Sequence, residues 1–240
     1  MLDNHLTHGA TKKFRLELIG IAAHVYMDTF SHYGFSGMSS VLNTVTPTSV
    51  ECVENPEEDL VSNLQQHLEE TKGLFAEAGS GSLGHAGAAS FPDWPYLHWS
   101  FDFLHPRPGS KKNQRDNSAT FLEGCNKLYD FFCRFVDKYY PKDSVKRKPF
   151  AEIKDEVQRI IQFRGEVEDR CRQWRESSLA SEAPAYIADR WEDEKIKMFE
   201  KLPASSDGID TNAYRFHQAA AYHRYYVLKD LLPEYKIAVY

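Results

Sequence analysis

The chain has 240 residues, which is enough for one large domain or two small ones. Its formal net charge of −6 argues against a nucleic-acid backbone as the main partner, because such partners attract basic surfaces. No stretch approaches the roughly 18 consecutive apolar residues of a transmembrane helix, so we expect no membrane span.

Residues 1–10 are expected to form a loose lead-in to the first helix. They show neither the basic n-region nor the apolar h-region of a signal peptide. The cysteines are scattered without a C-x-x-C spacing, and we expect them to be reduced: Cys52, Cys125, Cys133 and Cys171. A cytoplasmic location is therefore expected, with delivery by a specialised secretion system as an alternative.

Residues 11–33 are predicted to form the first helix, which Gly34 ends. His24, Asp28 and His32 follow one another at intervals of four, so they lie on one helical face. Apolar neighbours predict that at least two of the three are mostly buried, and buried polar groups need hydrogen-bond partners or a metal ion. Imidazole and carboxylate suit zinc, with manganese or iron as alternatives. Two ions, or one ion and a supporting histidine, fit the row better than one shared ion.

A second helix is predicted over residues 56–78, and a long loop over residues 79–116. The loop is too aromatic to be disordered, so we expect it to be functional and to pack across the first helix. Its candidates to complete the site are His85, Asp93, His98 and His105. The first two rank highest, because glycines allow close backbone approach near His85 and prolines fix the turn around Asp93. For each of them, a local hydrogen bond within the loop is the alternative.

Further helices are predicted over residues 118–139, with Asp116 or Asn117 as the cap, and over residues 150–179 as one charged helix or a broken pair. Two more follow, one from Pro184 to about residue 199 and one over residues 212–232. The predicted fold is therefore all-α: a single domain spanning residues 1–240, built as a bundle of about six helices with one long ordered loop.

Several common catalytic motifs are absent from the sequence. There is no G-x-S-x-G, P-loop, dinucleotide-binding G-x-G-x-x-G or H-E-x-x-H. The polar row of the first helix therefore carries the functional prediction.

Residues 20–37 resemble the signature G-I-x-x-H-x-Y-x-D-T-x-x-H-x-x-F-x-G of an uncharacterised bacterial family of unknown function. The resemblance continues at residues 84–86, 92–99, 116–121 and 216–233, and it leaves residues 140–200 unmatched. It implies a further segment before the signature helix, with its own Asp and His residues. If those residues complete the site, this chain holds an incomplete one.

More distantly, H-x-x-x-D followed by another histidine is similar to the zinc-binding helices of the phospholipase C and single-strand nuclease superfamily. Those all-α enzymes cleave phosphodiesters with a zinc cluster. Their second histidine is more widely spaced and they use an N-terminal Trp as a ligand, so the likeness is an analogy.

The first hypothesis is a metal-dependent hydrolase, most plausibly of small-molecule or lipid phosphoesters. Zinc would be held by His24, Asp28, His32 and His85, while Asp93 accepts a proton from water. His32 is a ligand or a second catalytic residue. The alternative is a non-enzymatic helical interaction module, in which the same row is a structural metal site or a polar core network.

Overall fold

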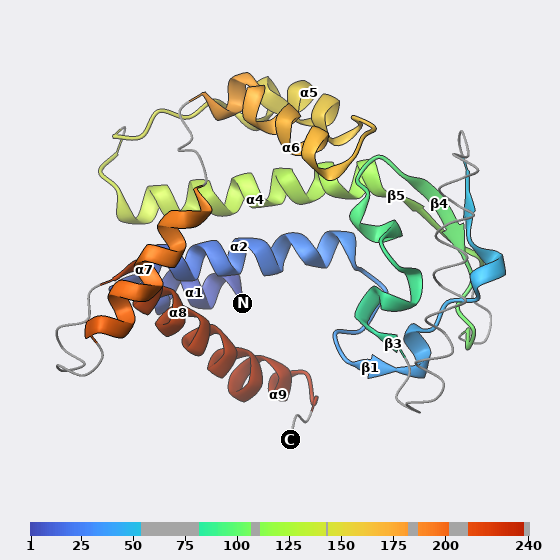
Figure 1. The fold of residues 1–240 in the computed structure, drawn as a ribbon, viewed down its shortest axis with the longest axis horizontal. Helices are drawn as coiled ribbons and strands as arrows, with labels where there is room; N and C mark the ends of the chain where they lie inside the picture. The colour runs from blue at the N-terminus through green and yellow to red at the C-terminus, as the bar shows by residue number, and fades with distance from the viewer. Residues whose placement is uncertain (54–81, 107–110, 143, 182–186, 202–210, 238–240) are drawn as a thin grey trace. The chain divides into compact units, whose positions relative to one another are not determined.

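The computed structural model describes residues 1–53, 82–106, 111–142, 144–181, 187–201 and 211–237 (Figure 1). The chain divides into two compact units, each described here by itself. Unit 1 comprises residues 1–26, 131–144 and 182–240, and unit 2 comprises residues 27–130 and 145–181. The boundaries fall within two long helices, α2 (Arg15–Ser31) and α4 (Asn117–Tyr139).

The regular secondary structure in the described residues of unit 1 is all helical. The lead-in expected over residues 1–10 is instead a helix, α1 (Leu2–Thr7), followed by a 3-10 turn at Gly9–Thr11. The helix is held because His5 and Leu6 are buried, which a polar-looking sequence does not reveal. The chain then contributes α7 (Ala188–Lys201), α8 (Asn212–Tyr226), a π-helical turn (Val227–Leu231) and α9 (Leu232–Glu234).

Helices α7 and α8 pack together around Met198 and Ala213, which are buried, with Trp191 against them. The predicted start of the last helix at Asn212 is confirmed. Thr211 caps it, because its side-chain oxygen accepts a hydrogen bond from the backbone N–H of Tyr214 at 3.2 Å.

In unit 2, the charged stretch from residue 150 is the broken pair, α5 (Phe150–Ile161) and α6 (Val167–Glu176). Helix α5 buries Val157, Ile160 and Ile161, whose spacing of three and four residues forms one apolar stripe. The start of α4 is capped by Asp116, whose carboxylate accepts from the backbone N–H of Ala119 at 3.1 Å.

Unit 2 also contains β-structure, so the all-α prediction is wrong in this respect, although the protein is mostly helical. A three-stranded antiparallel sheet has the order β2 (Glu51–Cys52), β4 (His98–Phe101), β5 (Asn113–Asp116). A short pair joins β1 (Ser39–Ser40) to β3 (Ser82–Leu83). The strands escape prediction because β5 reads Asn-Gln-Arg-Asp and because β4 buries consecutive residues, so neither shows apolar alternation.

An aromatic core explains why the described part of the long loop is ordered. Phe91, Trp99 and Phe101 are fully buried and pack with Val45 and Val50. Burial of each large side chain contributes roughly 1.5–3 kcal/mol, which offsets the entropy of ordering this segment. The helix predicted over residues 56–78 lies outside the described residues. Among the helices that the structure describes, none combines the length and apolar character needed to span a bilayer.

Candidate metal centre

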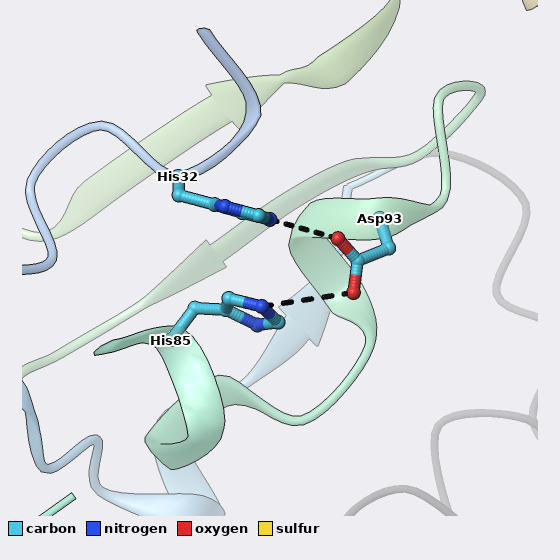
Figure 2. Close-up of side chains that lie close together, drawn as sticks. All are labelled: His32, His85 and Asp93. Carbon is cyan, nitrogen blue, oxygen red and sulfur yellow. Dashed lines mark hydrogen bonds and ion pairs between the residues drawn. The ribbon is translucent and has the colours of Figure 1, made fainter. Parts of the chain in front are cut away.

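Three potential metal ligands converge in unit 2: His32, His85 and Asp93 (Figure 2). Each offers one ligand atom, and these atoms all lie within 4.8 Å of one another. His32 follows the last residue of α2, whereas His85 and Asp93 belong to two 3-10 turns, Gly84–Ala88 and Phe91–Asp93. The expected approach of the long loop to the end of the first helix is therefore observed at His32.

His32 lies where α2 stops. Its backbone N–H still donates to the carbonyl of Asp28 at 2.9 Å, as in a helix. Two residues later, Gly34 has φ of +86°, a left-handed conformation that ends helices and that favours glycine. The chain turns there, and the His32 side chain points toward the loop (Figure 2).

His85 is oriented by its own turn. Gly84 has φ of +54°, and the His85 Nδ1 atom lies 2.9 Å from the carbonyl oxygen of Ala89. A carbonyl can only accept, so Nδ1 carries the proton and Nε2 of the neutral ring keeps its lone pair. That lone pair faces Asp93, which is the tautomer that a metal ligand requires.

The Asp93 carboxylate joins the two imidazoles. One oxygen, Oδ1, lies 2.8 Å from His32 Nε2, and the other, Oδ2, lies 3.8 Å from His85 Nε2. The His32 and His85 rings stack with centroids 4.1 Å apart. In the neutral tautomer of His85, the Nε2 lone pair and the carboxylate oxygen repel each other, so either a proton or a metal cation between them would remove an unfavourable contact.

Ligand atoms at 2.0–2.1 Å from a tetrahedral zinc are about 3.3 Å apart. The three candidate ligand atoms lie within 4.8 Å of one another, so side-chain shifts of the order of 1 Å would bring them to that spacing. The side chains of His32, His85 and Asp93 are 26%, 29% and 46% exposed, so the cluster is open to small molecules on one side. Two imidazoles and one carboxylate with an open side is the donor set of catalytic zinc sites.

Two of the three residues of the polar row, Asp28 and His32, are half-buried, and none of the three is fully buried. His24 is exposed and Asp28 is half-buried, and neither belongs to a ligand grouping in the described part of the chain. The buried residues of α2 explain this, because they gather on the opposite side of the helix: Leu18, Ile19, Ala22 and Ala23. Of the row, His32 alone joins the cluster.

The remaining loop candidates lie elsewhere. His98 is on β4, opposite Asp116 on β5, and lines a polar surface cavity of about 380 Å³ with Arg164. His105 is exposed. Neither is part of the three-residue cluster.

Comparison with protein families now adds one finding. The family of unknown function DUF6765 matches residues 1–231. The chain belongs to this family. No curated protein and no solved structure matches it. The resemblance to an uncharacterised family is thus confirmed, and the DUF6765 assignment covers the whole of the candidate site.

Two further features of this DUF6765 member were missed in the sequence. In unit 1, His5 is fully buried and its Nε2 lies 2.9 Å from Nδ1 of His223. In unit 2, Arg115 and Asn117 are buried next to the site. No sequence pattern marks His5 as buried, because it lies in a polar N-terminal stretch. The burial of Arg115 and Asn117 on either side of Asp116 can be recognised only once the strand that ends at Asp116 is known.

Proposed function

We propose that the protein is a metal-dependent hydrolase of phosphoester bonds, with zinc held by His32, His85 and Asp93. The observation that carries the proposal is the convergence of two imidazoles and a carboxylate within 4.8 Å on a partly exposed surface. Supporting evidence is the His85 tautomer, since its Nδ1 is engaged with Ala89 and its Nε2 faces the carboxylate.

Each residue has a definite role in this proposal. His32 and His85 donate imidazole nitrogens, and the Asp93 carboxylate supplies the charge that offsets the cation. We assign Asp93 as a ligand rather than the proton acceptor expected from the sequence, because its two oxygens face the two imidazoles. Bound zinc would lower the pKa of water and stabilise negative charge on the reacting phosphate. Zinc binding at His32 Nε2 requires this nitrogen to give up the proton that it shares with Asp93, which can move to Nδ1 of the same ring.

An arginine beside the cluster supports an anionic substrate. Arg170 on α6 places its Nη1 3.4 Å from the Asp93 carbonyl oxygen, and its guanidinium lies 5.9 Å from the Trp94 ring centroid. The Nε atom is buried without a hydrogen-bond partner among the described residues. Guanidinium groups match phosphate geometry, so Arg170 is the residue that we assign to the phosphoryl group.

One observation favours a second candidate, a polar network in a non-enzymatic interaction module. The 2.8 Å contact between His32 and Asp93 satisfies both groups by itself. In that case Asp93→Asn, which keeps one acceptor oxygen, would cost roughly 1 kcal/mol, and a chelator would not change the melting of the wild type.

Zinc titration of the metal-stripped protein separates the two candidates. We expect one zinc ion per chain for the wild type. Loss of a direct ligand in His85→Ala or Asp93→Asn should weaken binding beyond the roughly 10–100-fold of an outer-layer change. His105→Ala is the matched control, since it removes an exposed histidine of the same part of the chain.

Activity is then measured on a chromogenic phosphodiester, a phosphomonoester and phospholipid micelles. We expect zinc-dependent hydrolysis that His85→Ala abolishes, and a higher KM with less change in kcat for Arg170→Gln. A wild type that binds no zinc and melts identically with chelator would overturn the hydrolase and leave the polar network.

A further inference from the structure

The junction between β5 and α4 holds two buried polar residues, Arg115 and Asn117, which are 3% and 2% exposed. Asp116 between them is exposed and caps α4. Arg115 is on β5 and Asn117 is the first residue of α4, and residues two apart in the chain have Cα atoms at most about 7 Å apart. Burying a guanidinium away from water costs free energy, so the contacts of Arg115 indicate the structural role that offsets this cost.

Arg115 holds the end of α2 on both sides of His32. Its Nη1 donates to the carbonyl of Ser31 at 3.0 Å, and its Nη2 donates to the carbonyl of Tyr33. The guanidinium also lies 4.1 Å from the Tyr33 ring centroid and 5.1 Å from that of Phe35. The backbone that carries His32 is thus fixed to β5 through a planar fork, which a lysine cannot reproduce.

Asn117 holds the turn that carries Asp93 in the same way. Its Nδ2 donates to the carbonyl of Phe91 at 2.7 Å and to the carbonyl of Trp94 at 2.8 Å. Its Oδ1 accepts from the indole N–H of Trp99 at 3.0 Å, which fixes the orientation of the amide. The two acceptors flank Asp93, as the two acceptors of Arg115 flank His32.

We propose that Arg115 and Asn117 are positioning residues that together set the separation of His32 and Asp93. The inference rests on the proposed metal site for its consequence in metal binding. One short segment, the junction of β5 and α4, holds the backbone on both sides of each ligand, so the geometry of the pair follows from the rigidity of this junction. Neither residue touches the ligand atoms, and both act through the segments they hold.

The test uses the full chain with variants that keep size. Arg115→Lys retains the charge and loses the two-carbonyl fork, and Asn117→Asp retains the acceptor for Trp99 and loses both donors. Asn117→Ser is the second variant should the buried carboxylate prevent folding. Ile160→Val is the matched control for stability, because it trims a buried side chain of α5 and lies outside both held segments in the sequence.

Zinc affinity is the first readout. We expect Arg115→Lys and Asn117→Asp each to weaken zinc binding about 10–100-fold, while Ile160→Val leaves it unchanged. In a His32→Gln background, Arg115→Lys should no longer change zinc affinity, since the residue through which it acts is gone. An unchanged affinity in both positioning variants would overturn the proposal.

The second readout needs no metal, so it separates this inference from the proposed function. Ring-nitrogen NMR shifts of ¹⁵N-histidine report which imidazole nitrogen carries the proton. In zinc-free protein, Arg115→Lys and Asn117→Asp should shift the His32 signals away from those of a ring bonded to Asp93, and Ile160→Val should not. If the wild type binds no zinc but these shifts occur, the hydrolase fails and the positioning role stands. If the His32 signals match the wild type in both variants, the positioning role fails.

Discussion

At the scale of single residues, two glycines near one helix have opposite roles. Gly34 adopts φ of +86°, and a Cβ atom there would lie 3.3 Å from Nη2 of Arg115. Gly20 is inside α2, and a Cβ atom there would meet nothing within 4 Å. The conformational freedom of glycine is therefore needed at Gly34. At Gly20 it only adds to the entropy that the chain loses on folding.

We therefore expect Gly34→Ala to lower the free energy of unfolding by about 1–2 kcal/mol, through backbone strain and crowding of Arg115. Gly20→Ala should raise it by roughly 0.5–1 kcal/mol, because alanine costs less entropy in a helix. Urea denaturation of both variants gives the two values. Equal effects of the two substitutions would show that the left-handed turn after His32 is not needed.

At the scale of elements, docking of α1 in unit 1 depends on a neutral histidine. Burial, and next the neighbouring His223, lower the pKa of His5 from 6.5 to about 4. Burial also lowers the pKa of His223. The rings of Tyr222 and Tyr226 pack against His5 with centroids 5.8 and 5.2 Å away. The unfolded chain therefore binds a proton at His5 more tightly than the folded chain does.

The sign of the pH effect follows. Above pH 6.5 His5 is neutral in both states and has no effect on the pH dependence. As the pH is lowered from 6.5 to about 4, a proton binds His5 in the unfolded state but not in the folded state. The free energy of unfolding therefore decreases over this range, by about 3 kcal/mol in total. Urea midpoints at pH 7.5, 6 and 5 should decline for the wild type. The decline should be smaller for His5→Gln than for the wild type. It should equal that of the wild type for His8→Gln, because His8 is exposed. An equal decline in all three proteins would contradict the buried neutral state.

Elements also show what the sequence could reveal. Helical periodicity predicts α4 and α5, because each buries apolar residues three or four apart, and the breaks before residues 150 and 212 mark the starts of α5 and α8. The strand Asn113–Asp116 has no such pattern, since its buried residue is an arginine that donates to distant carbonyls. The spacing of His24, Asp28 and His32 predicts a common face, but spacing alone does not say which face the core covers.

The candidate site could be predicted only in part, because local sequence patterns do not show long-range contacts. His85 and Asp93 could be singled out because glycines and prolines mark tight turns around them. Their meeting with His32 depends on Arg115 and Asn117, which are far from all three in sequence. Such long-range polar contacts leave no local pattern, so tertiary structure is needed to find them.

At the scale of the whole molecule, the three candidate ligands belong to one unit. His32, His85 and Asp93 all lie in unit 2, whereas α7 and α8 belong to unit 1. A ligand that binds the native state stabilises it by about 2.7 kcal/mol at a hundred times its Kd. A local opening that breaks the site must also release the ligand, so its free energy rises by this amount. An opening elsewhere that leaves the site intact keeps its original free energy.

Hydrogen–deuterium exchange with and without zinc should therefore give a regional response. We expect slower exchange at residues 31–36, 84–94 and 113–117, which carry the ligands and the residues that hold them. Peptides from α7 and α8 serve as the internal reference and should exchange at unchanged rates, and Asp93→Asn should abolish the difference. Equal slowing in all peptides would mean that zinc acts only through global unfolding. Slowing confined to unit 1 would place the metal away from His32, His85 and Asp93, and the proposed site would then be wrong.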